Sequence, residues 1–122
     1  MKKITTTHAP AAIGPYSQGF IVNGLLYTSG QIPLTTQGTI PEGIVSQAHQ
    51  SCKNVGAILQ EAGIGFEQVF KTTCFLADMN DFVAFNEVYA EYFVSNPARS
   101  CVAVKTLPKG VLCEIEVIAV VS

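Results

Sequence analysis

Hydrophobic and polar positions follow a helical period in two segments of this chain. Apolar residues at three-and-four spacing from Ile44 to Ala62 predict an amphipathic helix, and Gly63 is a plausible stop. The same spacing from Phe82 to Phe93 predicts a second helix with an aromatic face, for which Asp78 or Asn80 is the candidate N-cap. We therefore expect two amphipathic helices, each of which packs its apolar face against the rest of the protein.

Segments rich in β-formers precede, separate and follow these helices. The strands they predict span residues 20–22, 25–28, 69–76, 98–104 and 112–121. Asn23-Gly24 between the first two is a strong signal for a tight hairpin, because both residues tolerate positive φ. Pro108 and Gly110 favour a reversal between the last two strands, which could pair antiparallel. This order predicts an α+β fold with two helices on one face of a mixed sheet.

Alternation along the last two strands gathers charged groups. Arg99 and Cys101 share one face of the strand at 98–104, and Glu114 and Glu116 share one face of the strand at 112–121. If these strands pair, a carboxylate approaches the arginine. The pattern does not fix the register, so it leaves open which glutamate is nearer.

Composition limits the kind of protein. The 122 residues are enough for one domain, spanning 1–122, and 48% of them are hydrophobic while 13% are charged. So little charge predicts an oligomer that buries a large apolar interface. The longest aliphatic run, Val117 to Val121, is far shorter than the roughly 20 residues that span a bilayer. A net charge of −2 without a basic cluster argues against nucleic acid as a partner.

The N-terminus and the cysteines point to a reducing compartment. Met1-Lys2-Lys3 is followed by Ile4 and a run of threonines rather than by an apolar signal core, so we expect a cytoplasmic protein. The four cysteines have no C-x-x-C spacing, which favours neither a zinc site nor a disulfide framework. We expect them to act as small buried hydrophobes. They are Cys52, Cys74, Cys101 and Cys113.

Arg99 is the only arginine of the chain, and it stands in an otherwise apolar strand. A guanidinium in such surroundings needs an anion, and its planar fork suits a carboxylate. Two glycine-containing segments could shape a site around it. The segment from Gly14 to Gly19 is typical of a loop of fixed shape. In the segment from Thr28 to Pro33, Gly30 permits a ligand to approach the backbone closely, and Ser29 adds a hydroxyl.

These segments together resemble the Rid family of imine deaminases, also called the YjgF family. The matching stretches are 8–19, 29–33, 80–82, Asn86, 97–102, 107–109 and 114–116. The resemblance spans nearly the whole chain. It implies a chorismate-mutase-like fold that assembles as a homotrimer, with ligand clefts between neighbouring subunits.

The resemblance also implies an activity. Members of the RidA type hydrolyse 2-iminobutanoate and 2-iminopropanoate to 2-oxo acids and ammonia, and so remove reactive products of pyridoxal-phosphate-dependent dehydratases. Arg99 would hold the substrate carboxylate. Glu114 would position or activate the attacking water and assist proton transfer to the departing nitrogen. No metal or organic cofactor is then needed.

Further pocket residues follow from the same resemblance. Tyr16, Ser29 and Gly30 would line the pocket, and Cys101 would contribute backbone contacts and wall. Asn86 would either face the cleft or serve as a surface or capping residue. We expect Glu116 to be a solvent or interface charge.

Two other functions remain open at this point. A regulatory trimer could bind a 2-oxo acid or a similar carboxylate through Arg99 without turnover. A chaperone-like trimer would use its apolar surface instead of the pocket. The sequence leaves open the preferred imino acid and the subunit that supplies each cleft residue.

Overall fold

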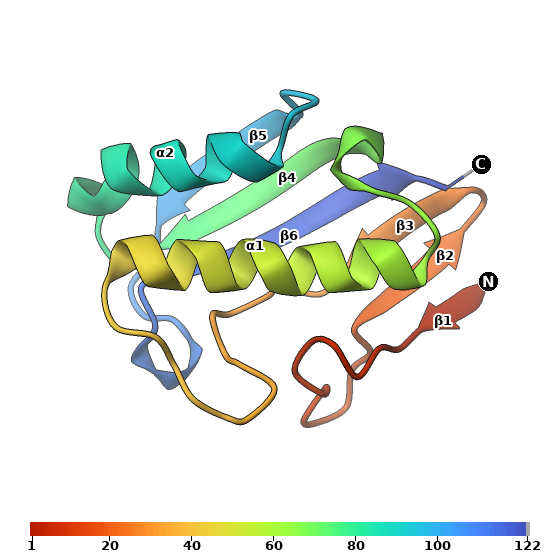
Figure 1. Ribbon diagram of the computed structural model, residues 1–122, viewed down its shortest axis with the longest axis horizontal. Helices are drawn as coiled ribbons and strands as arrows, with labels where there is room; N and C mark the ends of the chain where they lie inside the picture. Colours follow the sequence, from red (N-terminus) through yellow and green to blue (C-terminus); the bar gives the residue numbers. More distant parts are fainter. Residues whose placement is uncertain (122) are drawn as a thin grey trace.

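The computed structural model describes residues 1–121, in which two helices are separated by one strand, preceded by three strands and followed by two (Figure 1). In chain order they are β1 (Lys2–Ile4), β2 (Gly19–Val22), β3 (Leu25–Thr28), α1 (Ile44–Glu61), β4 (Val69–Leu76), α2 (Phe82–Tyr92), β5 (Ala98–Ala103) and β6 (Cys113–Val120). The predicted hairpin forms around Asn23-Gly24, whose φ angles are both positive. Asp78 caps a short 3₁₀ turn before α2 by accepting a hydrogen bond from the amide of Asn80.

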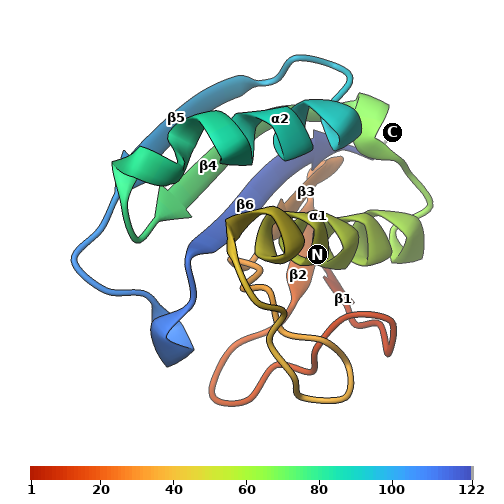
Figure 2. The same cartoon turned by 60° about the vertical axis from the view of Figure 1, so that its left-hand side comes forward.

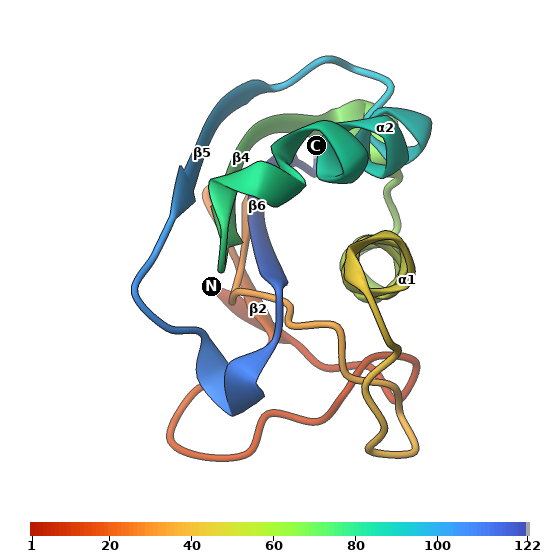
Figure 3. The same ribbon diagram turned by 90° about the vertical axis from the view of Figure 1, so that its left-hand side faces the viewer.

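One sheet and two helices make two layers. The sheet has the order β1-β2-β3-β6-β4-β5, and the pair of β4 and β5 is parallel while the others are antiparallel. Helices α1 and α2 cover the same face of the sheet (Figure 3). The predicted α+β fold, with two helices on one face of a mixed sheet, is confirmed.

The core lies between the helices and the sheet. On β6 the alternate residues from Cys113 to Ala119 are buried, and they meet buried side chains of α1 such as Val55 and Ile58. Phe85 and Val88 of α2 complete this layer over β4. The helical and strand periods of the sequence therefore mark the buried faces directly.

The predicted pairing of the last two strands is wrong. β4 lies between them: Thr72 pairs with Arg99 of β5 on one side and with Val117 of β6 on the other. The cause is α2, which carries the chain back to the starting end of β4 so that β5 runs parallel to it. β5 thus occupies the edge of the sheet, with α2 beside it (Figure 2).

No helix of residues 1–121 covers the other face of the sheet (Figure 3). Tyr27, Val102 and Val120 on this face are each more than a third exposed. Within the same residues, no helix combines the length and the apolar character needed to cross a membrane.

Three connections gather at one end of the sheet (Figures 1 and 3). They are residues 5–18 before β2, 29–43 between β3 and α1, and 104–112 before β6. Their meeting point positions the candidate site.

Candidate functional site

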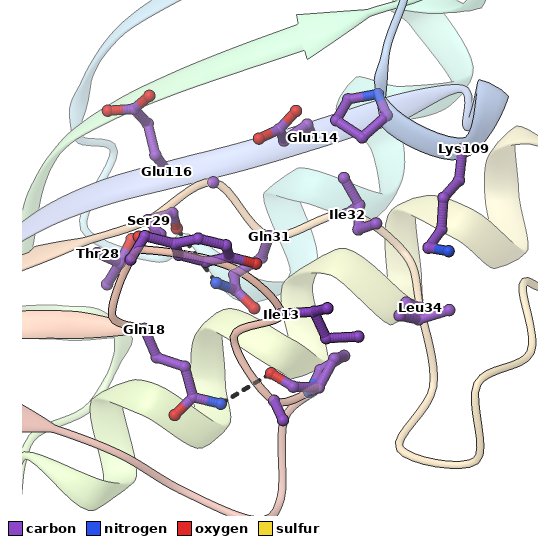
Figure 4. Close-up of a pocket in the computed structure, with 15 residues that line it drawn as sticks. Ile13, Gln18, Thr28, Ser29, Gln31, Ile32, Leu34, Lys109, Glu114 and Glu116 are labelled. Carbon is purple, nitrogen blue, oxygen red and sulfur yellow. Dashed lines mark hydrogen bonds between the residues drawn. The ribbon is translucent and has the colours of Figure 1, made fainter.

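A cavity of about 630 Å³ opens where these three connections meet β6 (Figure 4). Its lining combines apolar side chains with carboxylates, a combination typical of sites that bind a small polar ligand. Its lining comprises Pro10, Ala11, Ile13, Tyr16, Gln18, Thr28, Ser29, Gly30, Gln31, Ile32, Leu34, Pro108, Lys109, Glu114 and Glu116. The predicted residues Tyr16, Ser29, Gly30 and Glu114 thus lie together in one cavity.

Glu114 lies directly over the backbone of Gly30. The segment after β3 is joined to β6 by two hydrogen bonds, Gln31 N to Ile115 O at 2.8 Å and Ile115 N to Gln31 O at 3.2 Å. A Cβ atom at position 30 would lie 2.7 Å from the carboxyl carbon of Glu114 and still closer to its Oε2. Position 30 therefore has to be glycine for the carboxylate to occupy this place.

A second carboxylate faces the same cavity. Glu116 lies two residues further along β6, and both side chains rise from the same face of the strand (Figure 4). Partial burial raises the pKa of Glu114, and the neighbouring charge of Glu116 raises it further. A carboxylate in this setting is a stronger base than an exposed one, which suits a role in proton transfer.

Buried amides hold the cavity wall in place. Gln18 accepts a hydrogen bond from Thr6 N at 2.7 Å and donates to the carbonyls of Thr6 and Pro10 at 3.1 and 2.8 Å. Ser29 donates its hydroxyl hydrogen bond to the carbonyl of Ser17. The loop before β2, which carries Tyr16, is thereby fixed against the end of β3.

Arg99 lies in a different place, a shallow depression of about 320 Å³ between β5 and α2. Its Nη1 donates a hydrogen bond to Asn86 Oδ1 at 2.8 Å, and its guanidinium carbon lies 4.7 Å from the ring centre of Tyr89. Asn86 therefore orients the guanidinium, and the aromatic face supports it by a cation–π contact. Cys101 follows two residues later on the same face of β5 and is half-buried.

The structure does not bring Arg99 and Glu114 together within one chain. Arg99 is in register with Thr72, whereas Glu114 is in register with Phe75 and points to the opposite face of the sheet. Their strands are two positions apart, roughly 10 Å, and the register adds about 10 Å along the strand. The sequence-based expectation that a β6 carboxylate approaches the arginine is wrong for a single subunit.

Sequence reasoning missed part of the cavity. Gln18, Gln31 and Lys109 line it without having been singled out, and Glu116 faces it instead of standing apart from it. For Glu116 the sequence did contain a signal, because alternation along the strand places it on the same face as Glu114. Among residues 1–121 no three His, Cys, Asp or Glu side chains cluster as a metal site would require.

These features define a class: an α+β sheet protein with a carboxylate-lined cavity on one face and an oriented arginine on the other. The family model described as "Endoribonuclease L-PSP" matches residues 6–121. The chain belongs to this family, the YjgF or Rid family.

Relatives within the family carry different names. The chain is 56% identical to "Putative regulator AldR" of Lactococcus lactis, covering 100% of this chain and 99% of the relative. It is 51% identical to the mouse "2-iminobutanoate/2-iminopropanoate deaminase", covering 98% and 90%. Among solved structures it is similar to Escherichia coli TdcF with bound serine, with a TM-score of 0.95, 47% identity and 98% of each chain covered.

Proposed function

We propose that this protein hydrolyses 2-imino acids such as 2-iminobutanoate and 2-iminopropanoate to 2-oxo acids and ammonia. The observation that carries the proposal is the Glu114 carboxylate, which lies over Gly30 in the cavity and whose pKa is raised. The relative named as a deaminase of these two substrates supports it. Such a reaction would remove reactive enamines and imines released by pyridoxal-phosphate-dependent dehydratases.

We infer that a complete site needs two subunits. A 2-imino acid carries a carboxylate beside its imine carbon, so its binding group and its reacting group must lie a few ångströms apart. Arg99 and Glu114 of one chain lie on opposite faces of the sheet. The neighbouring subunit of a homotrimer would supply the missing arginine at the Glu114 cavity.

The sheet surface supports such an assembly. The uncovered face, with Tyr27, Val102 and Val120, is an apolar surface of the kind that oligomers bury. The free edge at β5 brings Arg99 to the margin of each subunit. A trimer assembled through this face would also account for a charged fraction of 13%.

The chemistry then divides between the two groups. Arg99 holds the substrate carboxylate by paired hydrogen bonds, and Asn86 keeps its guanidinium oriented. Glu114 accepts a proton from a water molecule as the water oxygen attacks the imine carbon, and it then passes this proton to the nitrogen, which gives a carbinolamine. Glu114 next takes the proton of the new hydroxyl group and delivers it to the amino group, so that the carbonyl forms as the carbon–nitrogen bond breaks and ammonia and the 2-oxo acid leave. Tyr16, Ser29 and Gly30 form the wall against which the imine lies.

A second function is favoured by the relative named as a regulator, at 56% identity. The same cleft could bind a 2-oxo acid through Arg99 without turnover. The two functions differ in whether Glu114 changes a rate or only an affinity.

The test is a coupled assay in which a threonine dehydratase generates 2-iminobutanoate and its decay is followed with and without this protein. We expect faster decay, and a loss of roughly 10²–10⁴-fold in the Glu114→Gln variant, the usual contribution of general acid-base catalysis. Glu61→Gln, an exposed change at the end of α1, is the matched control and should be silent. Saturable binding of 2-oxobutanoate without any acceleration would instead establish the regulatory function.

A further inference from the structure

Two cysteines face each other across neighbouring strands beside Arg99. Cys74 of β4 is in register with Cys101 of β5, and both lie on the helix-facing side of the sheet. Neighbouring strands are about 4.7–4.9 Å apart, and disulfides join residues whose Cα atoms are about 4.4–6.8 Å apart. The backbone therefore already stands at a separation that a disulfide requires.

The two thiols differ in exposure and in proton affinity. Cys101 lies on the edge strand and is half-buried, whereas Cys74 is buried. A hydrogen bond from the Cys74 thiol and the positive charge of Arg99 lower the pKa of Cys101 to about 7. The same hydrogen bond, together with burial, raises the pKa of Cys74. The accessible member of the pair is thus the one that ionises more readily.

The other two cysteines provide an internal contrast. Cys52 of α1 and Cys113 of β6 are fully buried in the core. Burial raises the pKa of Cys113 to about 11 and also raises that of Cys52. Neither has both the exposure and the thiolate character that make a cysteine reactive.

We propose that Cys101 and Cys74 form a peroxide-sensitive pair in which Cys101 is oxidised first and Cys74 resolves the product as an intrachain disulfide. In the first step the Cys101 thiolate attacks hydrogen peroxide, the O–O bond breaks, and a sulfenic acid and hydroxide form. In the second step the Cys74 sulfur attacks the Cys101 sulfur, the S–OH bond breaks, and water leaves with the Cys74 proton. The pair loses two electrons and one peroxide is reduced.

The disulfide would also affect substrate binding at the proposed site. Arg99 stands two residues before Cys101 on the same face of β5, so a bond that ties Cys101 to β4 changes the wall beside the guanidinium. This consequence rests on the proposed function. If that function holds, oxidation raises the KM for the imino acid, and a dithiol reductant restores it.

The experiment treats the fully reduced protein with hydrogen peroxide, blocks remaining thiols with N-ethylmaleimide in denaturant, and maps the peptides by mass spectrometry. We expect a cross-linked pair of peptides containing Cys74 and Cys101, while Cys52 and Cys113 escape oxidation and are found alkylated by N-ethylmaleimide. This readout is independent of any enzyme activity, so it can succeed or fail apart from the proposed function.

Two variants separate the steps. In Cys74→Ala the oxidation should stop at a Cys101 sulfenic acid, which dimedone traps, whereas in Cys101→Ala Cys74 should stay reduced. Cys52→Ala is the matched control and should still form the disulfide. The proposal is overturned if Cys74 and Cys101 of the peroxide-treated wild-type protein are both found alkylated, or if Cys101 is oxidised without forming a disulfide with Cys74.

Discussion

The cavity around Glu114 and the depression around Arg99 hold their charged groups by different means. Glu114 is placed by backbone: the bridge between Gln31 and Ile115 brings Gly30 under the carboxylate. Arg99 is placed by side chains, through the Asn86 amide and the Tyr89 ring. Backbone placement tolerates almost no change at position 30, whereas side-chain placement can be weakened in steps. The comparison predicts a graded series of effects.

The largest effect is expected for Gly30→Ala. The new methyl group would overlap the Glu114 carboxyl, so the side chain must move away from the cavity. We expect activity to fall by at least roughly 10-fold, whereas the free energy of unfolding should change little, because the overlapping atoms belong to a flexible side chain and not to the backbone. Rates and denaturant unfolding measure the two quantities. A stability loss of about 1–3 kcal/mol, the usual cost of overpacking a core, would mean that another contact requires glycine.

Asn86→Ala should have an intermediate effect. It removes the acceptor of the Arg99 hydrogen bond, a charge-assisted contact worth about 1.5–3 kcal/mol, so we expect roughly a 10-fold higher KM with kcat less affected. Glu87→Ala, an exposed change on the same helix, is the control. In an Arg99→Lys background, which keeps the positive charge but loses the planar fork that Asn86 orients, the Asn86 change should cost less than in the wild-type chain. An equal cost in both backgrounds would contradict a role through Arg99.

The smallest effect concerns the pH profile. In the proposed mechanism Glu114 acts in its ionised form, so activity should decline as pH falls through the raised pKa of this group. Glu116→Gln removes a negative charge that raises this pKa, and the acid limb should therefore move to lower pH. Rate profiles of both proteins measure the shift. A limb that stays in place, or moves to higher pH, would show that Glu116 does not act on Glu114.

Much of the fold was accessible from periodicity. The bounds of α1 and β4, the hairpin at Asn23-Gly24 and the buried face of β6 all follow from local spacing. The pairing of β5 did not, because alternation tells which residues share a face but not which strand lies beside which. That choice is made by packing of α2 over β4, a contact between distant parts of the chain.

The candidate site divides in the same way. Residue types with unusual chemistry, such as Arg99 and Glu114, stand out in the sequence. Gln18 and Gln31 do not, since a glutamine that fastens a loop looks like any surface glutamine until its partners are known. That the two charged groups lie on opposite faces required the strand order, which no local pattern contains.

The central claim is that one cleft combines Glu114 of one subunit with Arg99 of another. Arg99→Ala and Glu114→Gln chains, co-expressed with different affinity tags, can be purified in sequence so that only mixed oligomers remain. Each mixed trimer has one cleft with both wild-type groups, so the account predicts about a third of wild-type activity from two inactive parents. Mixed oligomers as inactive as either parent would contradict it.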